Sequence, residues 1–198
     1  MDILQEAAKA WKELTQYRYN FTYGYKKELH SIHLTFSLED FPHLAGFQYL
    51  EDISLPNYNS SKIVDRILEK KITFEQIKKS SNYINMVQPR LFALIQLKHS
   101  LDNDFNLYSF FPKMYPFTTQ IKADYLISSH VNISSFVFII KNSILDNSEY
   151  DFVCCSIFEQ GERNYESNQR LRTILKKERL HIPTNTYTIL SDKLSQKK

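Results

Sequence analysis

Residues 17–25 read Tyr-Arg-Tyr-Asn-Phe-Thr-Tyr-Gly-Tyr, and residues 30–36 read His-Ser-Ile-His-Leu-Thr-Phe. In the first stretch every second residue is aromatic. In the second, His30 and three apolar residues alternate with small or polar ones. A period of two is typical of β-strands, whose successive side chains point to opposite faces. With Lys26 and Lys27 as the turn, the two stretches predict a β-hairpin that has one aromatic face.

Helical and extended periodicities divide the rest of the chain. Thr73-Phe74-Glu75-Gln76 matches a capping box, which predicts a helical region that Pro89 breaks or kinks. Ser37-Leu38-Glu39-Asp40 is typical of a helix start. The expected helices cover residues 2–15, 62–69, 73–101 and 162–179, and a further helix starts at residue 37. The further expected strands are residues 105–110, 117–128, 135–141, 150–158 and 184–190.

Short polar loops, residues 129–134 and 142–149, join three of the expected strands. Loops of this length connect antiparallel neighbours, because a parallel crossover needs a dozen or more residues. We therefore expect one α+β domain over residues 1–198. It would contain an N-terminal helix and hairpin, a helical middle, and an antiparallel sheet with a C-terminal helix packed on it.

The composition excludes several classes of protein. The chain has 198 residues and only 3 glycines, too few for a glycine-rich phosphate loop or a dinucleotide fingerprint. The longest apolar run, Phe136–Ile140, is far shorter than the ~20 residues that span a bilayer, and the acidic N-terminus is unlike a signal peptide. Cys154 and Cys155 are adjacent, which indicates two reduced, mostly buried thiols. We expect a cytoplasmic protein that does not contact membranes.

Positive charge is concentrated near the C-terminus. The whole chain carries a net charge of +3, whereas residues 170–198 hold eight Lys and Arg against Glu178 and Asp192. This segment is either a solvated helix face with a basic tail or a surface that attracts phosphate backbones.

Three positions could carry chemistry. His43, in Phe41-Pro42-His43-Leu44-Ala45-Gly46-Phe47, is either a core histidine or a general acid or base. Lys122 shares one face of an expected strand with Asp124, where it either forms a surface ion pair or faces a phosphate. Ser156 lies between a strand and an expected helix, where it is a filler, a cap or part of an anion site.

Metal-ligand spacing is missing from the sequence. His30 and His33 are three residues apart on an expected strand and so face opposite sides. The cysteines and the other histidines are scattered. We expect neither a metal nor another cofactor.

The order of the motifs resembles a group of phage-associated nucleases in the Barnase–EndoU–colicin–RelE-like (BECR) superfamily. The resemblance extends from about residue 17 to residue 190, and a tyrosine-rich first strand and a threonine-rich last strand also fit. Phe47 stands where Leu is expected, and Cys154-Cys155 stand where a more polar stretch is usual. The motifs that carry the resemblance are Phe41-x-His43-Leu44-x-Gly46-Phe47, Ile121-Lys122-Ala123-Asp124-Tyr125-Leu126, Phe136-Val137-Phe138-Ile139, Ser156-Ile157-Phe158 and Tyr165-x-x-x-Gln169.

The resemblance implies metal-independent RNA cleavage, in which a ribose 2′-hydroxyl attacks the adjacent phosphorus. The aromatic residues of the 17–25 strand either stack RNA bases or, as is commoner, pack the core. The roles that the resemblance implies are His43 as the base or acid, Lys122 as the phosphate cation, Ser156 and Tyr165 as hydrogen-bond donors, Gln169 as a positioning group, and Arg163, Arg170 and Arg172 as contacts to the RNA backbone.

The function expected from this resemblance is a toxin-type endoribonuclease, phage- or defence-associated and restrained by an inhibitor protein. One alternative is a non-catalytic module that binds protein or nucleic acid on an inactivated nuclease fold, because a fold does not determine a function. Another is a nucleotide-linked transferase that uses His and Tyr on a sheet.

Overall fold

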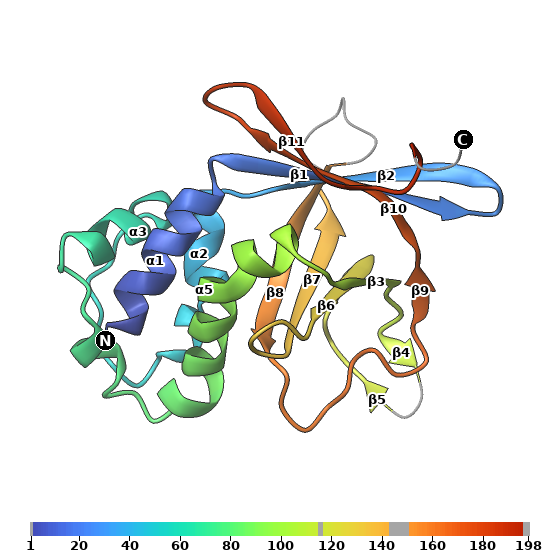
Figure 1. The fold of residues 1–198 in the computed structure, drawn as a ribbon. Coiled ribbons are helices and arrows are strands. Elements are labelled where there is room, and N and C mark those ends of the chain that lie inside the picture. The colour runs from blue at the N-terminus through green and yellow to red at the C-terminus, as the bar shows by residue number, and fades with distance from the viewer. Residues whose placement is uncertain (1, 115–116, 143–150, 196–198) are drawn as a thin grey trace.

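The computed structural model describes residues 2–114, 117–142 and 151–195. Within them, helices gather on one side of a curled sheet (Figure 1). The helices are α1 (Ile3–Leu14), α2 (Phe41–Leu44), α3 (Ser60–Leu68), α4 (Phe74–Ile77) and α5 (Gln88–Asp102), with short 3₁₀ turns at Leu38–Asp40 and Phe47–Tyr49 and a π-helical turn at Tyr83–Val87. The strands are β1 (Tyr17–Tyr25), β2 (Glu28–Thr35), β3 (Asn106–Ser109), β4 (Lys113–Met114), β5 (Phe117–Thr118), β6 (Tyr125–Ser129), β7 (Ser135–Lys141), β8 (Asp151–Glu159), β9 (Arg170–Arg172), β10 (Ile174–His181) and β11 (Thr186–Asp192).

One nine-stranded sheet dominates the described residues, in the order β11-β10-β1-β2-β8-β7-β6-β3-β9. Every neighbouring pair is antiparallel except β2 and β8, which run parallel. Only Thr173 separates β9 from β10, although these strands lie at or near opposite ends of the sheet. The sheet must therefore curl until its two ends approach one another (Figure 1).

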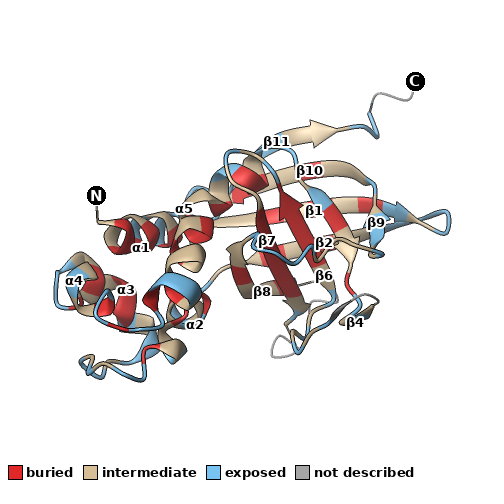
Figure 2. Ribbon diagram, turned by 90° about the horizontal axis from the view of Figure 1, so that it is seen from below, coloured by how far each residue is buried: buried red, intermediate tan, exposed pale blue. Residues whose placement is uncertain are grey.

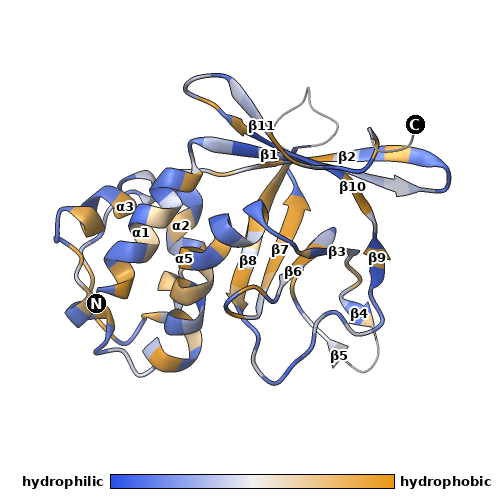
Figure 3. Cartoon of the chain, in the orientation of Figure 1, coloured by the Kyte–Doolittle hydropathy of each residue, from blue (hydrophilic) through white to orange (hydrophobic). Residues whose placement is uncertain are grey.

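The core lies between the inner face of this sheet and the helices. Figure 2 shows buried positions along β6, β7 and β8 and on the inner faces of α1, α3 and α5. Much of β7 and β8 is hydrophobic in Figure 3. Trp11 of α1 is fully buried, and its ring nitrogen donates to the Ser37 carbonyl at 2.9 Å. This bond ties α1 to the segment that leads into α2.

The predicted hairpin is confirmed. β1 and β2 pair from Tyr19–Leu34 to Tyr25–Glu28, and Lys26 and Lys27 form the turn with φ of 49° and 68°. Tyr19, Phe21 and Tyr23 are buried, so these three aromatic side chains pack the core.

The antiparallel order of the central strands is also confirmed. β6 pairs with β7 and β7 with β8, both antiparallel. Of the two loops used to predict this order, residues 129–134 are described, whereas residues 143–149 lie outside the described residues. The parallel pairing of β2 with β8 was not predicted, because it joins segments more than 100 residues apart.

The predicted helix over residues 162–179 is wrong, because that segment forms β9 and β10 after an irregular stretch. Leu171, Ile174 and Leu175 have helical spacing, which explains the error. In the structure β9 pairs with β3 and β10 pairs with β1. Those distant pairings outweigh the local periodicity.

The predicted strand over residues 117–128 is wrong in its middle. β5 pairs with β4 in a separate two-stranded sheet, and the chain re-enters the large sheet only at β6. Between them the Thr119 hydroxyl accepts from the Ile121 amide at 3.2 Å. Such a local bond competes with ladder pairing. Lys122 and Asp124 are therefore not on one strand face.

The middle of the chain is helical as expected, with one difference. The capping box is present, since Gln76 donates its amide to the Thr73 hydroxyl and accepts from the Thr73 amide at 2.8 Å. Pro89 lies in the first turn of α5. Backbone N–H groups in a first turn have no partner within the helix, so the N–H that proline lacks costs α5 no hydrogen bond. It begins a helix and does not break one. No helix among the described residues is long and apolar enough to cross a bilayer.

Candidate active site

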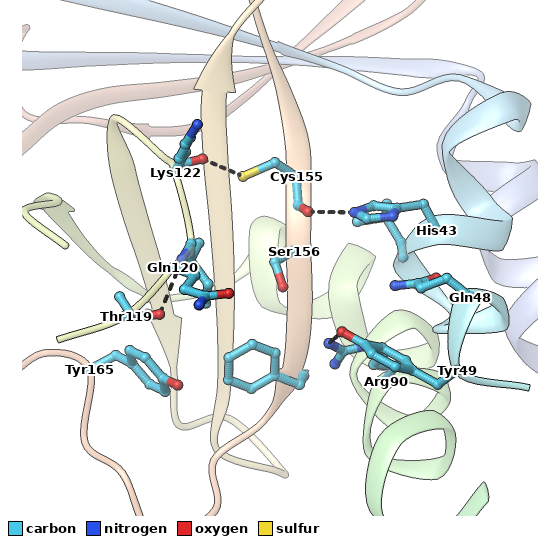
Figure 4. A pocket seen from close by; sticks show the side chains of 13 residues that line it. His43, Gln48, Tyr49, Arg90, Thr119, Gln120, Lys122, Cys155, Ser156 and Tyr165 are labelled. Carbon is cyan, nitrogen blue, oxygen red and sulfur yellow. Dashed lines mark hydrogen bonds between the residues drawn. The ribbon is translucent and has the colours of Figure 1, made fainter. Parts of the chain in front are cut away.

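A cleft of about 480 Å³ opens where α2, α5 and β8 meet the irregular residues 119–122. In Figure 4, β8 forms its floor, with Cys155 and Ser156. One wall carries Thr119, Gln120, Lys122 and Tyr165; the other carries His43, Gln48, Tyr49 and Arg90. His43, Lys122, Ser156 and Tyr165, all singled out in the sequence, thus line one cleft although up to 122 positions separate them.

His43 is held by the free edge of β8. β2 pairs with β8 only as far as Val153, and beyond that point α2 occupies this edge. There the Nε2 atom of the exposed His43 ring lies 3.2 Å from the Cys155 carbonyl oxygen. A carbonyl can only accept, so Nε2 carries the hydrogen. In the neutral ring, Nδ1 then keeps a free lone pair and can act as a base.

Cys155 is the extra residue of a β-bulge. Phe138 pairs with Ser156 and Ile139 with Cys154, which leaves Cys155 without an opposite partner in β7. Its thiol sulfur lies 3.4 Å from the carbonyl oxygens of both Lys122 and Phe138. Burial raises the pKa of the Cys155 thiol to about 11, so the thiol keeps its proton at neutral pH and can donate it. The bulge thus holds His43 through its carbonyl and the backbone of Lys122 through its thiol.

Gly46 lets Arg90 reach the cleft. Its φ of +85° is in the left-handed region that favours glycine. A Cβ atom there would lie 2.8 Å from Arg90 Cδ and 2.9 Å from the Met86 carbonyl oxygen. The glycine in the His43-Leu44-x-Gly46 motif is thereby explained by the close approach of α5.

The cleft is cationic. The Arg90 guanidinium lies 5.2 Å from the centroid of the Tyr49 ring and 5.4 Å from that of Phe158, which fix its position. Lys122 lies on the opposite wall of the cleft (Figure 4). No carboxylate of the described part of the chain lies within ion-pair distance of Lys122, and none lines the cleft. Two unneutralised cations make this site suited to a phosphate.

Tyr165 is anchored from two sides. Its ring packs edge-on against Phe136 and Phe138, with centroid distances of 5.4 Å for each. The next residue, Glu166, accepts from Tyr108 at 3.3 Å, contacts His130 Nε2 at 2.9 Å and also accepts from Ser128. The bonds to Glu166 fasten the loop to the sheet and so position the Tyr165 hydroxyl.

The structure does not bring the other predicted residues into this cleft. Gln169 bonds to the backbone of Phe111, as donor at 3.0 Å and acceptor at 2.8 Å, which makes it a loop brace. Arg163 lines an adjoining hollow. Arg170 and Arg172 lie on β9, not on a helix, and Arg172 stacks over Tyr25 at 4.0 Å.

Sequence reasoning missed several residues of the cleft, namely Gln48, Tyr49, Arg90, Thr119 and Gln120. Arg90 is the most consequential, because it supplies the second cation. Arg90 follows Pro89 at the start of α5, and no sequence motif surrounds it. Its packing against Gly46 and Tyr49, which are distant in the sequence, places it in the cleft.

His30 and His33 have different neighbours. His30 stacks on Tyr23 with a centroid distance of 5.3 Å, and His33 Nδ1 lies 3.6 Å from an Asp151 carboxylate oxygen. Across the described ranges, no three His, Cys, Asp or Glu side chains are grouped as metal ligands would be.

Comparison with protein families gives a match over nearly the whole chain. The family described as phage-Barnase-EndoU-ColicinE5/D-RelE like nuclease4 matches residues 3–194, and the chain belongs to this family of nucleases. The resemblance identified from the sequence motifs is thereby confirmed. A search of curated proteins and a search of solved structures found no match.

Proposed function

We propose that this nuclease is an endoribonuclease that cleaves RNA by attack of a ribose 2′-hydroxyl on the adjacent phosphorus, without a metal ion. One observation carries the proposal: His43 is held through Nε2, with Nδ1 left as a base, in a cleft that carries Arg90 and Lys122 and no lining carboxylate among the described residues. A base beside two cations is what this reaction needs.

One residue on each wall of the cleft transfers a proton. His43 Nδ1 takes the proton of the 2′-hydroxyl, and the 2′-oxygen bonds to phosphorus. The bond from phosphorus to the 5′-oxygen breaks, and the Tyr165 hydroxyl, on the wall opposite His43, gives that oxygen a proton (Figure 4). The products are a 2′,3′-cyclic phosphate and a 5′-hydroxyl, and solvent restores both side chains.

Charge stabilisation falls to the remaining groups. The phosphorane has one more negative charge than the ground-state phosphodiester. Arg90 and Lys122, which both line the cleft, would stabilise that charge. Ser156, on the floor of the cleft, donates a hydrogen bond to a non-bridging oxygen. Groups fixed before the reaction stabilise such charge effectively because they need no reorganisation.

The proposal extends to the biological role. Because 2′-hydroxyl attack needs only RNA and the protein, we propose a cytoplasmic toxin-type enzyme that an inhibitor protein restrains. Expression of the chain alone should then arrest bacterial growth, whereas His43→Ala should not.

Cleavage of RNA by purified protein in the presence of a chelator tests the activity. We expect His43→Ala to slow cleavage by a factor of about 10²–10⁴, which is typical for the loss of a general base. His99→Ala is the matched control, since His99 is exposed on α5 and its ring hydrogen-bonds to the nearby Asn103 side chain. Binding of RNA without cleavage would favour the non-catalytic alternative.

A further inference from the structure

The cleft continues into a second hollow of about 410 Å³. Arg90, Phe158 and Tyr165 line both spaces and form the boundary between them. The volume is within the ~300–1,000 Å³ of pockets that hold small molecules. In an RNA chain a nucleoside follows each phosphate directly, so a scissile phosphate in the cleft would place a neighbouring nucleoside at this boundary.

The chemistry of the second hollow differs from that of the cleft. Glu159 and Glu162 line it, whereas no described carboxylate lines the cleft. Phe158 and Tyr165 offer an aromatic surface, with ring centroids 5.5 Å apart and ring planes inclined by 62°, and the Arg90 guanidinium lies over the Phe158 ring. Aromatic rings and guanidinium planes are the surfaces on which unpaired RNA bases stack.

The carboxylates add selectivity to this stacking surface. Glu159 is the last residue of β8, lines this hollow and is half-buried. An ionised carboxylate only accepts hydrogen bonds. Adenine, cytosine and guanine each present an exocyclic amino group as a donor, whereas uracil presents a single N–H between two carbonyl acceptors, which repel a carboxylate.

We propose that this second hollow is a nucleobase subsite that packs one RNA base against Phe158 and Tyr165 and selects amino-bearing bases over uracil through Glu159. The inference rests on the proposed ribonuclease function for its place beside the scissile phosphate. Arg163, on the rim, contacts the phosphate on the far side of that nucleoside.

Two measurements test the subsite. In the first, the cut sites of a random-sequence RNA are mapped. The wild-type protein should prefer adenine, cytosine or guanine over uracil by about tenfold at one position beside the cut. A factor of about ten is what one additional charge-assisted hydrogen bond contributes to binding. Glu159→Gln should lose most of that preference but still cleave, and Glu75→Gln, an exposed carboxylate on α4, should behave as the wild type.

The second measurement needs no cleavage. The four ribonucleoside 3′-monophosphates are titrated separately while the Gly161 amide signal is followed by NMR, because Gly161 lines the hollow. The three amino-bearing nucleotides should bind about tenfold more tightly than uridine monophosphate, and Glu159→Gln should reduce that gap. Equal binding of all four, or a gap unchanged by Glu159→Gln, would overturn the subsite even in a protein that cleaves RNA. Selective binding by a protein that cleaves no RNA would support the subsite and reject the ribonuclease proposal.

Discussion

Replacement of Gly46 by alanine should damage both the fold and the cleft. The residue has a φ of +85°, a conformation that costs an L-residue about 1–2 kcal/mol. The new Cβ would lie 2.9 Å from the Met86 carbonyl oxygen, which is backbone and cannot rotate away. Overpacking of this kind costs about 1–3 kcal/mol more. Gly46→Ala should therefore lower the free energy of unfolding by about 2–5 kcal/mol, which lowers the thermal midpoint by about 10 °C.

Thermal unfolding followed by circular dichroism measures this effect, and Gly161→Ala is the matched control. A Cβ at Gly161 meets no atom within 4 Å and the residue needs no left-handed backbone, so that variant should unfold like the wild type. Because the new Cβ of Gly46→Ala also lies 2.8 Å from Arg90 Cδ, RNA cleavage per folded molecule should fall as well. If both alanine variants unfold at the same temperature, the packing argument for the motif glycine is refuted.

Two further predictions concern acid–base behaviour. Hydrogen bonds from Ser80 and Ser81 lower the pKa of Asp52 to about 2, below the unfolded value of 3.8, so its contribution to stability is present above pH 3.8 and is lost as pH falls through about 2. Asp52→Asn should lower the urea midpoint at pH 7 and match the wild type near pH 2; an equal deficit at both pH values would contradict this. Burial raises the pKa of the Cys155 thiol to about 11 and that of Cys154 well above 9, so a thiol reagent at pH 8 should label the native protein slowly and label both free cysteines after unfolding in urea. Rapid labelling of the native protein would show that the bulge is open.

Sequence patterns predicted the elements whose structure depends on interactions between neighbouring residues. The alternating aromatic residues of β1 face the core, so their period appears directly in the sequence. The capping box at Thr73 is equally local. Residues 170–181 gave a false helical signal, because pairing with β3 and β1 across the curled sheet decides their structure. Lys177 illustrates this: it is buried opposite Phe21, a contact that no nearby residue indicates.

The candidate site was partly predictable for a similar reason. His43, Lys122, Ser156 and Tyr165 belong to motifs that the resemblance supplied, and the structure places all four around one cleft. Their catalytic roles stay predictions. Arg90 and the Cys155 bulge could not be predicted, because each acts through a contact between distant segments. Gln169 was assigned to the site from its motif, but its side-chain oxygen and nitrogen both bond to the backbone of Phe111.

The chemical nature of the cut ends distinguishes attack by the 2′-hydroxyl from attack by water. A short RNA is incubated with the protein in a chelator, and its fragments are analysed by mass spectrometry beside an RNA of the same sequence that carries one 2′-deoxyribose at the cut site. We expect fragments with a 2′,3′-cyclic phosphate and a 5′-hydroxyl, no cleavage at the deoxy position, and loss of these products with His43→Ala. Cleavage at the deoxy position, or the same products at an undiminished rate from His43→Ala, would contradict it.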